Sequence, residues 1–70
     1  MKTKLQTDVY ALGISIEQIR ARLAERYGDR VSRGTVTKAI SGAAKSELSR
    51  RIAGVAQDLV WEVQANAGQH

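Results

Sequence analysis

The sequence predicts an all-α fold, a compact bundle of four or five short helices in a single domain. Apolar residues recur every three to four positions in four separate segments, as one face of a helix requires. No run of β-branched residues alternates cleanly enough for a strand. The chain lacks proline, and glycines mark the segment ends. A chain of 70 residues corresponds to one domain, which we place at residues 1–65, followed by a flexible tail at 66–70.

The first two predicted helices open with capping residues. The first, over residues 4–12, follows Thr3 as its N-cap and ends before a glycine, which takes the left-handed C-terminal conformation at little cost. The second, over residues 16–27, opens with a capping box formed by Ser15 and Gln18. Helical spacing then predicts that these two helices bury Leu5, Val9, Leu12, Ile16, Ile19, Leu23 and Tyr27.

The third and fourth predicted helices differ in length. The third covers only residues 33–40 after the N-cap Ser32, and its β-branched residues make it dependent on tertiary contacts. The fourth follows Ser46 and runs to Ala65. Gly54 in its middle costs about 1 kcal/mol relative to alanine, which favours a close approach by another helix. The expected buried positions are Val36, Ala39, Ile40, Leu48, Ile52, Val55, Ala56, Leu59 and Val63.

Positive charge is concentrated in the middle of the chain. The net charge is +4, but residues 20–51 hold nine basic and three acidic side chains, so that window alone carries +6. A basic stretch in a small domain indicates a polyanionic partner, although a solvated surface has the same composition. The three aromatic residues do not alternate with the basic ones, which argues against binding of single strands by base stacking.

Several classes of function are excluded by composition. The chain has no cysteine and one histidine, His70, so we expect no metal site, no cofactor and no catalytic nucleophile–base pair, and therefore no enzyme. The glycines form no phosphate-binding fingerprint, and no small-molecule ligand is expected. Neither a membrane-spanning run of about 18 apolar residues nor an apolar signal-peptide segment is present, which predicts a protein without membrane contact.

The stretch from Ala24 to Gly42 carries the functional signal. Two predicted helices meet at a glycine turn, and the second is short, opens with a serine cap and carries small, polar and cationic residues on its outer positions. The major groove of B-DNA admits one such helix, whose N-terminal residues reach the base edges. The segment 31–40, Val-Ser-Arg-Gly-Thr-Val-Thr-Lys-Ala-Ile, resembles the recognition helix of lambda-repressor-like helix-turn-helix proteins, especially small phage regulators of the Cro and Ner type. Relative to that family, Asp29 and Arg30 are additional residues in the turn.

The predicted DNA contacts fall into two groups. Arginine is suited to a bidentate bond with guanine, and the resemblance implies a base contact from Lys38, so the predicted base contacts are Arg33, Gly34, Thr35, Thr37 and Lys38. Contacts to phosphate set affinity and register without reading sequence. The candidates for them, each of which is equally explained as a solvated charge or a cap, are Arg20, Arg30, Ser32, Lys45, Arg50 and Arg51.

We therefore expect a sequence-specific regulator of transcription that binds double-stranded DNA. Its expected role is that of a repressor encoded by a phage or mobile element. Its expected location is the nucleoid, in the cytoplasm of a bacterial or phage-infected cell. Apolar residues near the chain end predict a homodimer through Leu59, Val60, Trp61 and Val63, with a lid over the core as the alternative role for the tryptophan. Two other functions stay open, an architectural, excisionase-like DNA-bending factor and a protein-interaction module of the antirepressor kind.

Overall fold

The computed structural model describes residues 3–43 and 45–67, and all regular structure within them is helical. This confirms the predicted all-α class with four α-helices, and a single 3-10 turn, η1, is the only other regular element in that part of the chain. The elements are α1 (Lys4–Ala11), α2 (Ile16–Tyr27), η1 (Gly28–Arg30), α3 (Arg33–Ser41) and α4 (Glu47–Ala67).

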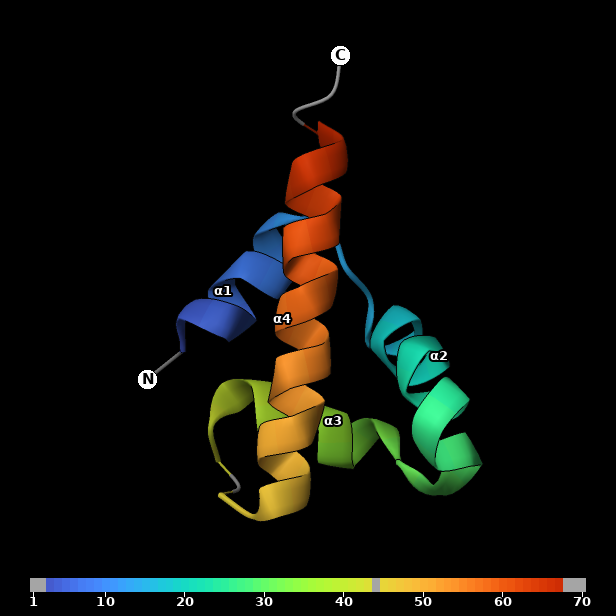
Figure 1. Ribbon diagram of the computed structural model, residues 1–70. Coiled ribbons are helices and arrows are strands. Elements are labelled where there is room, and N and C mark those ends of the chain that lie inside the picture. Colours follow the sequence, from blue (N-terminus) through green and yellow to red (C-terminus); the bar gives the residue numbers. More distant parts are fainter. Residues whose placement is uncertain (1–2, 44, 68–70) are drawn as a thin grey trace.

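The long helix α4 organises the molecule. In Figure 1 it runs along the full height of the bundle, with α1 and α2 on opposite sides and α3 crossing behind its N-terminal half. All four helices contribute side chains of at most 1% exposure to one core. The largest of these are Val9, Ile19, Leu23, Val36, Ile40, Ile52 and Val60. A single continuous core explains how so short a chain holds four helices together.

The ends of α2 and α3 follow the predicted capping. The Ser15 hydroxyl accepts a bond from the Gln18 backbone N–H at 3.1 Å, and the Gln18 side chain accepts one from the Ser15 N–H at 2.7 Å, which is the predicted capping box. Helix α2 ends at Gly28 with φ 64°, and α3 ends at Gly42 with φ 77°. Both angles lie in the region that favours glycine, so these two residues set the direction of the chain on either side of α3.

Thr3 joins the beginning of the fold to the end of α3. Its hydroxyl oxygen accepts a bond from the Gln6 backbone N–H at 3.1 Å, and the same hydroxyl donates to the Ile40 carbonyl at 2.6 Å. The Thr3 methyl group lies 3.1 Å from the place where a Cβ on Gly42 would stand. The turn after α3 is therefore held against the start of α1.

Helix α4 departs from the prediction at several positions. It continues to Ala67 instead of ending at Ala65, because no helix-breaking residue precedes position 68; residues 68–70 of the predicted tail lie outside the described part. Leu48 is 41% exposed instead of buried, and Val60 is fully buried. Within the protomer, no other described residue makes the expected close approach at Gly54, since nothing lies within 4 Å of a Cβ built there.

An ion pair between Arg22 and Glu62 ties α2 to the C-terminal half of α4. Both carboxylate oxygens of Glu62 accept hydrogen bonds from the guanidinium group, one of them at 3.2 Å. These hydrogen bonds, with the attraction of the charge, hold the pKa of Glu62 below its usual value and raise the pKa of Arg22. The pair is open to solvent, so its contribution to stability is small and sensitive to salt.

We expect Glu62→Gln to lower the melting temperature slightly at neutral pH and to have no effect in acid. A carboxylate whose pKa is depressed on folding stabilises the fold above its unfolded pKa, and this contribution disappears as the pH falls through the folded pKa. Thermal unfolding of both proteins between about pH 7 and pH 3 measures the difference. Asp8→Asn is the control, because Asp8 forms no ion pair with another described residue and is not among the charges that act on Arg22 or Glu62. A difference that is independent of pH would contradict the assigned cause.

Candidate nucleic-acid interface

The exposed face of α3 gathers four of the five residues predicted to contact bases. Arg33, Gly34, Thr37 and Lys38 are exposed, whereas the opposite face of the same helix is buried in the core. The helical period places these four residues within one contiguous arc of the helix surface. Beyond its chain neighbours and the backbone of α3, the only described atom within 4 Å of a Cβ built on Gly34 is the Ser32 hydroxyl oxygen, at 4.0 Å. The backbone at Gly34 is therefore accessible from solvent.

The remaining predicted base contact, Thr35, lies at the edge of this face. It is half-buried, and its backbone N–H donates to the Ser32 hydroxyl at 3.2 Å. The two hydroxyl oxygens also lie 2.9 Å apart in a hydrogen bond. Ser32 and Thr35 thus cap α3, as the sequence indicated for the serine. The Thr37 hydroxyl donates to the Arg33 carbonyl at 2.9 Å and keeps its acceptor capacity.

Glu17, which the sequence reasoning missed, holds the first residue of α3. Its carboxylate lies 3.0 Å from Arg33 Nε and 3.1 Å from Arg20 Nη1. Arg33 remains 70% exposed, so the ion pair orients the guanidinium group without removing it from solvent. The only sequence signal was an acidic residue in the first turn of α2, which the helix dipole explains equally well.

Arg20 braces the connection between α2 and α3. Its Nε donates to the Val31 carbonyl at 3.1 Å, while Nη1 pairs with Glu17. The side chain is half-buried and already holds two partners, so it has less capacity for a phosphate than a free arginine. Val31 directly follows η1, so this hydrogen bond ties the end of the turn to α2.

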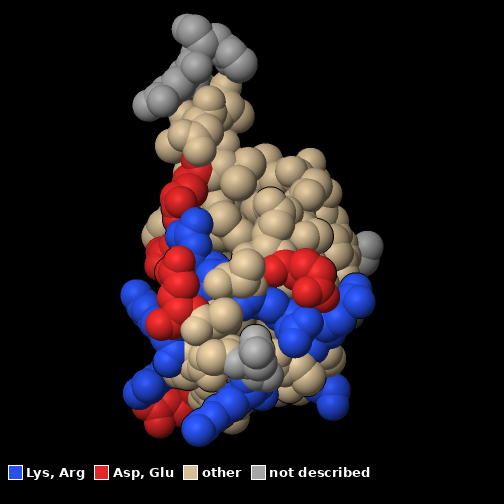
Figure 2. All heavy atoms as spheres, turned by 90° about the vertical axis from the view of Figure 1, so that its right-hand side faces the viewer, with Lys and Arg blue, Asp and Glu red and all other residues tan. Residues whose placement is uncertain are grey.

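The other predicted phosphate contacts lie in different places. Lys45 and Arg50 line a hollow beside the C-terminal end of α3, together with Gly42 and Ala39. Arg51 pairs with a carboxylate oxygen of Glu47 at 2.7 Å and lines a separate hollow between α2 and α4. Figure 2 shows Lys and Arg gathered over the lower half of one face, with acidic groups among them. Only part of the basic charge therefore borders α3.

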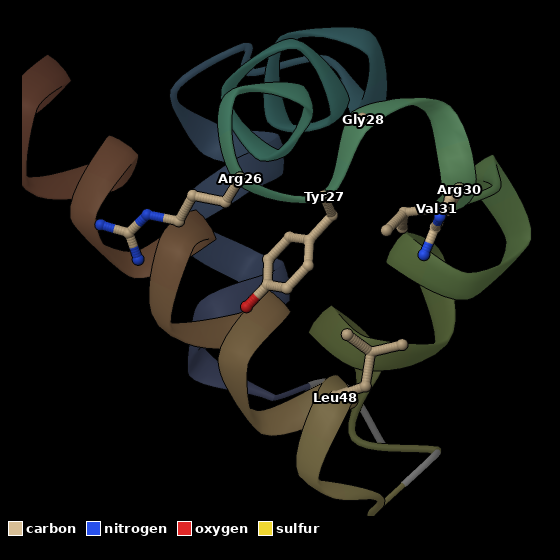
Figure 3. A pocket seen from close by; sticks show the side chains of 6 residues that line it. All are labelled: Arg26, Tyr27, Gly28, Arg30, Val31 and Leu48. Carbon is tan, nitrogen blue, oxygen red and sulfur yellow. The ribbon is translucent and has the colours of Figure 1, made fainter.

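A further hollow, of about 500 Å³, lies between η1 and the start of α4. Figure 3 shows the Tyr27 ring and the Leu48 side chain in it, with Arg26 and Arg30 at its sides. Its walls are mostly apolar carbon, and it contains no cluster of polar groups of the kind that orients a cofactor. Arg30 thus stands beside this hollow rather than on the exposed face of α3.

The four residues predicted to form a dimer interface are not equally available. Leu59 is 7% exposed and Val60 fully buried, so both belong to the core of the protomer. Val63 is half-buried, and Trp61 is 60% exposed. Helical periodicity explains the difference, because adjacent residues on α4 point about 100° apart. Only Trp61 offers a large exposed surface.

No group of three or more acidic, histidine or cysteine side chains that could hold a metal ion occurs among the described residues. Within the same part of the chain, no helix has the length and apolar character needed to cross a membrane. Comparison with protein-family models, with curated proteins and with solved structures found no match to this chain. The geometry of α2, α3 and their surroundings is therefore the basis on which a function can be inferred.

Proposed function

We propose that this protein is a sequence-specific regulator of transcription that binds double-stranded DNA, with α2 and α3 as its helix-turn-helix and α3 in the major groove. The observation that carries the proposal is the exposed face of α3, where Arg33, Gly34, Thr37 and Lys38 lie together. These residues combine a bidentate donor, a second cation, a hydroxyl group and an open backbone. This is the chemistry that reads base edges in the major groove.

The ends of α3 suit the phosphates on either side of a groove. Lys45 and Arg50 stand beside its C-terminal end, where they can contact one strand. The N-terminal end offers the positive end of a helix dipole to a phosphate on the other side. The protein would act by occupying its site and excluding polymerase or another regulator, as a repressor of phage or mobile-element genes does.

Glu17 gives the free protein a built-in selectivity against non-specific contacts. Its carboxylate lies close to where a phosphate approaching Arg33 would stand, and like charges repel. A base edge carries no net charge and meets a weaker repulsion than a phosphate does. The Glu17–Arg33 pair therefore favours base reading by Arg33 over phosphate binding.

Selection from a random duplex library at near-physiological salt tests the proposal. We expect retained duplexes to share one short motif, and a duplex with that motif to bind roughly 10³-fold or more tightly than random DNA. Retention without a motif, lost as salt rises, would favour the architectural alternative. No retention at low salt would overturn DNA binding and favour a protein partner.

A further inference from the structure

One face of α4 is exposed to solvent from Glu47 to Ala65. Six exposed residues recur along it at spacings of four, three, four, three and four, the pattern of a helix that pairs with another helix. We call this face the α4 stripe; it consists of Glu47, Arg51, Gly54, Asp58, Trp61 and Ala65. All six residues are exposed, whereas the buried residues of α4 lie at other positions around the helix.

Gly54, at the centre of the stripe, has no function inside the protomer. It lies in the middle of a 21-residue helix with ordinary helical geometry, where glycine costs about 1 kcal/mol relative to alanine. It is exposed, and nothing lies within 4 Å of a Cβ built on it. An added side chain would meet only open space, so the protomer gives no reason for a glycine. A second helix backbone approaching this point would give one.

The charges of the stripe are complementary about Gly54. Arg51, which pairs with Glu47 at 2.7 Å within the protomer, lies three residues before Gly54, and Asp58 lies four residues after it. An antiparallel copy of α4 centred on Gly54 therefore brings each Arg51 beside the partner helix's aspartate, displaced along the axis by one residue, or about 1.5 Å. The same register places Trp61, seven residues after the glycine, opposite Glu47, seven residues before it. The indole ring then also meets the neighbouring Arg51 guanidinium group, a favourable cation–π arrangement.

The surface beside the stripe is hollowed and carries an exposed aromatic ring. A hollow of about 400 Å³ adjoins it between α2 and α4, lined by Tyr27 and Arg26 as well as by Arg51, Gly54 and Asp58. Trp61 is 60% exposed, more than any other large hydrophobic side chain in the described residues. Burial of this ring supplies the apolar contact that the protomer lacks.

We infer that the protein forms a two-fold symmetric dimer through antiparallel pairing of the α4 stripes, with Gly54 on the axis. The two Gly54 backbones meet at the centre, two Arg51–Asp58 ion pairs flank them, and the two Trp61 rings close the ends. The interface is isologous, since each protomer contributes the same surface. It replaces the set of residues predicted from sequence and retains from it only Trp61.

A disulfide test reads the register directly. The natural chain has no cysteine, so a variant with a single cysteine carries one thiol per protomer. Gly54→Cys places the two thiols at the axis, and mild oxidation with oxidised glutathione should link most of the protein. Ala65→Cys lies on the same stripe but about 33 Å from its copy at 1.5 Å per residue, and should stay unlinked. Linking of both variants, or of Ala65→Cys alone, would overturn the antiparallel register.

Sedimentation equilibrium without DNA measures the strength of the dimer. Gly54→Leu should raise the dissociation constant roughly tenfold or more, while the melting temperature of the dilute protomer stays level or rises, because leucine is the better helix former. Arg51→Asp and Asp58→Arg should each weaken the dimer, and the double variant should restore it. Trp61 is the only tryptophan, so its emission should shift to the blue as the protein concentration rises.

These outcomes are independent of the proposed DNA binding, because no nucleic acid is present. A protein that stays monomeric at millimolar concentration would overturn the dimer and leave the function of α3 unaffected. A dimer that Gly54→Leu leaves intact would also overturn the interface. Failure of the charge exchange to restore association would exclude the pairing of Arg51 with Asp58.

Discussion

Arg33→Ala is expected to reduce affinity for the preferred duplex by about 1–3 kcal/mol and to relax the base preference at one position of the site. Arg33 is the first residue of α3, it is 70% exposed, and Glu17 orients it from 3.0 Å away. Loss of its bidentate bond to a guanine affects only duplexes that contain that base. Fluorescence anisotropy with the selected duplex, with each single-base variant of it and with random DNA measures the change.

Arg50→Ala is the matched comparison, because Arg50 lies beside the other end of α3 and not on its exposed face. It should weaken the selected and the random duplex alike and reduce the salt slope by about 0.9 for one lost phosphate contact. Arg26→Ala, in the hollow between η1 and α4, should change neither. If Arg33→Ala weakens every duplex by the same factor, α3 does not read bases through this residue.

Leu23→Ala is expected to destabilise the fold by about 2–5 kcal/mol. Leu23 lies on α2 and is fully buried in the core, so its truncation leaves a cavity there. A domain of 70 residues has a total stability of about 4–10 kcal/mol at 0.05–0.15 kcal/mol per residue. The variant should therefore lose a large share of its stability, with a fall in melting temperature of roughly 10 °C or more.

Leu48→Ala removes the same atoms from a side chain that is 41% exposed. We expect it to cost less than about 1.5 kcal/mol, because part of its surface is already in contact with water. Urea unfolding followed by circular dichroism, at a concentration low enough to exclude association, compares the two variants. Equal losses for Leu23→Ala and Leu48→Ala would contradict the assignment of the core.

The helix ends were predictable because their determinants are local. A capping serine accepts a hydrogen bond from the backbone N–H three residues later, and a terminal glycine adopts a positive φ. Both effects act within one turn of the helix. Ser15, Ser32, Gly28 and Gly42 therefore stand where the sequence placed them, and the helices α2 and α3 begin where expected. The buried face of α3 followed in the same way, since three apolar residues at helical spacing define a single side.

Side chains near the boundary of a helix face were not predictable in this way. Leu48 fits the apolar period of α4 but is 41% exposed, whereas Val60, which the predicted buried set omits, is fully buried. Arg50 and Arg51 are adjacent in sequence, yet they line different hollows because one residue turns the helix by about 100°. Periodicity orders the residues around a helix, but long-range packing decides how much of that circumference is covered.

By itself, the sequence determined the helical class, the capped starts of α2 and α3, the basic centre of the chain and the outer residues of α3, all of which follow from composition and local hydrogen bonding. Only the tertiary structure decided that Glu17 reaches Arg33, that Arg20 turns to the Val31 carbonyl, and that Gly54 faces open space. Each of these depends on where two segments far apart in the chain come to lie. Such contacts depend on the angles between the helices. Packing of the common core sets these angles, and a local sequence pattern does not encode them.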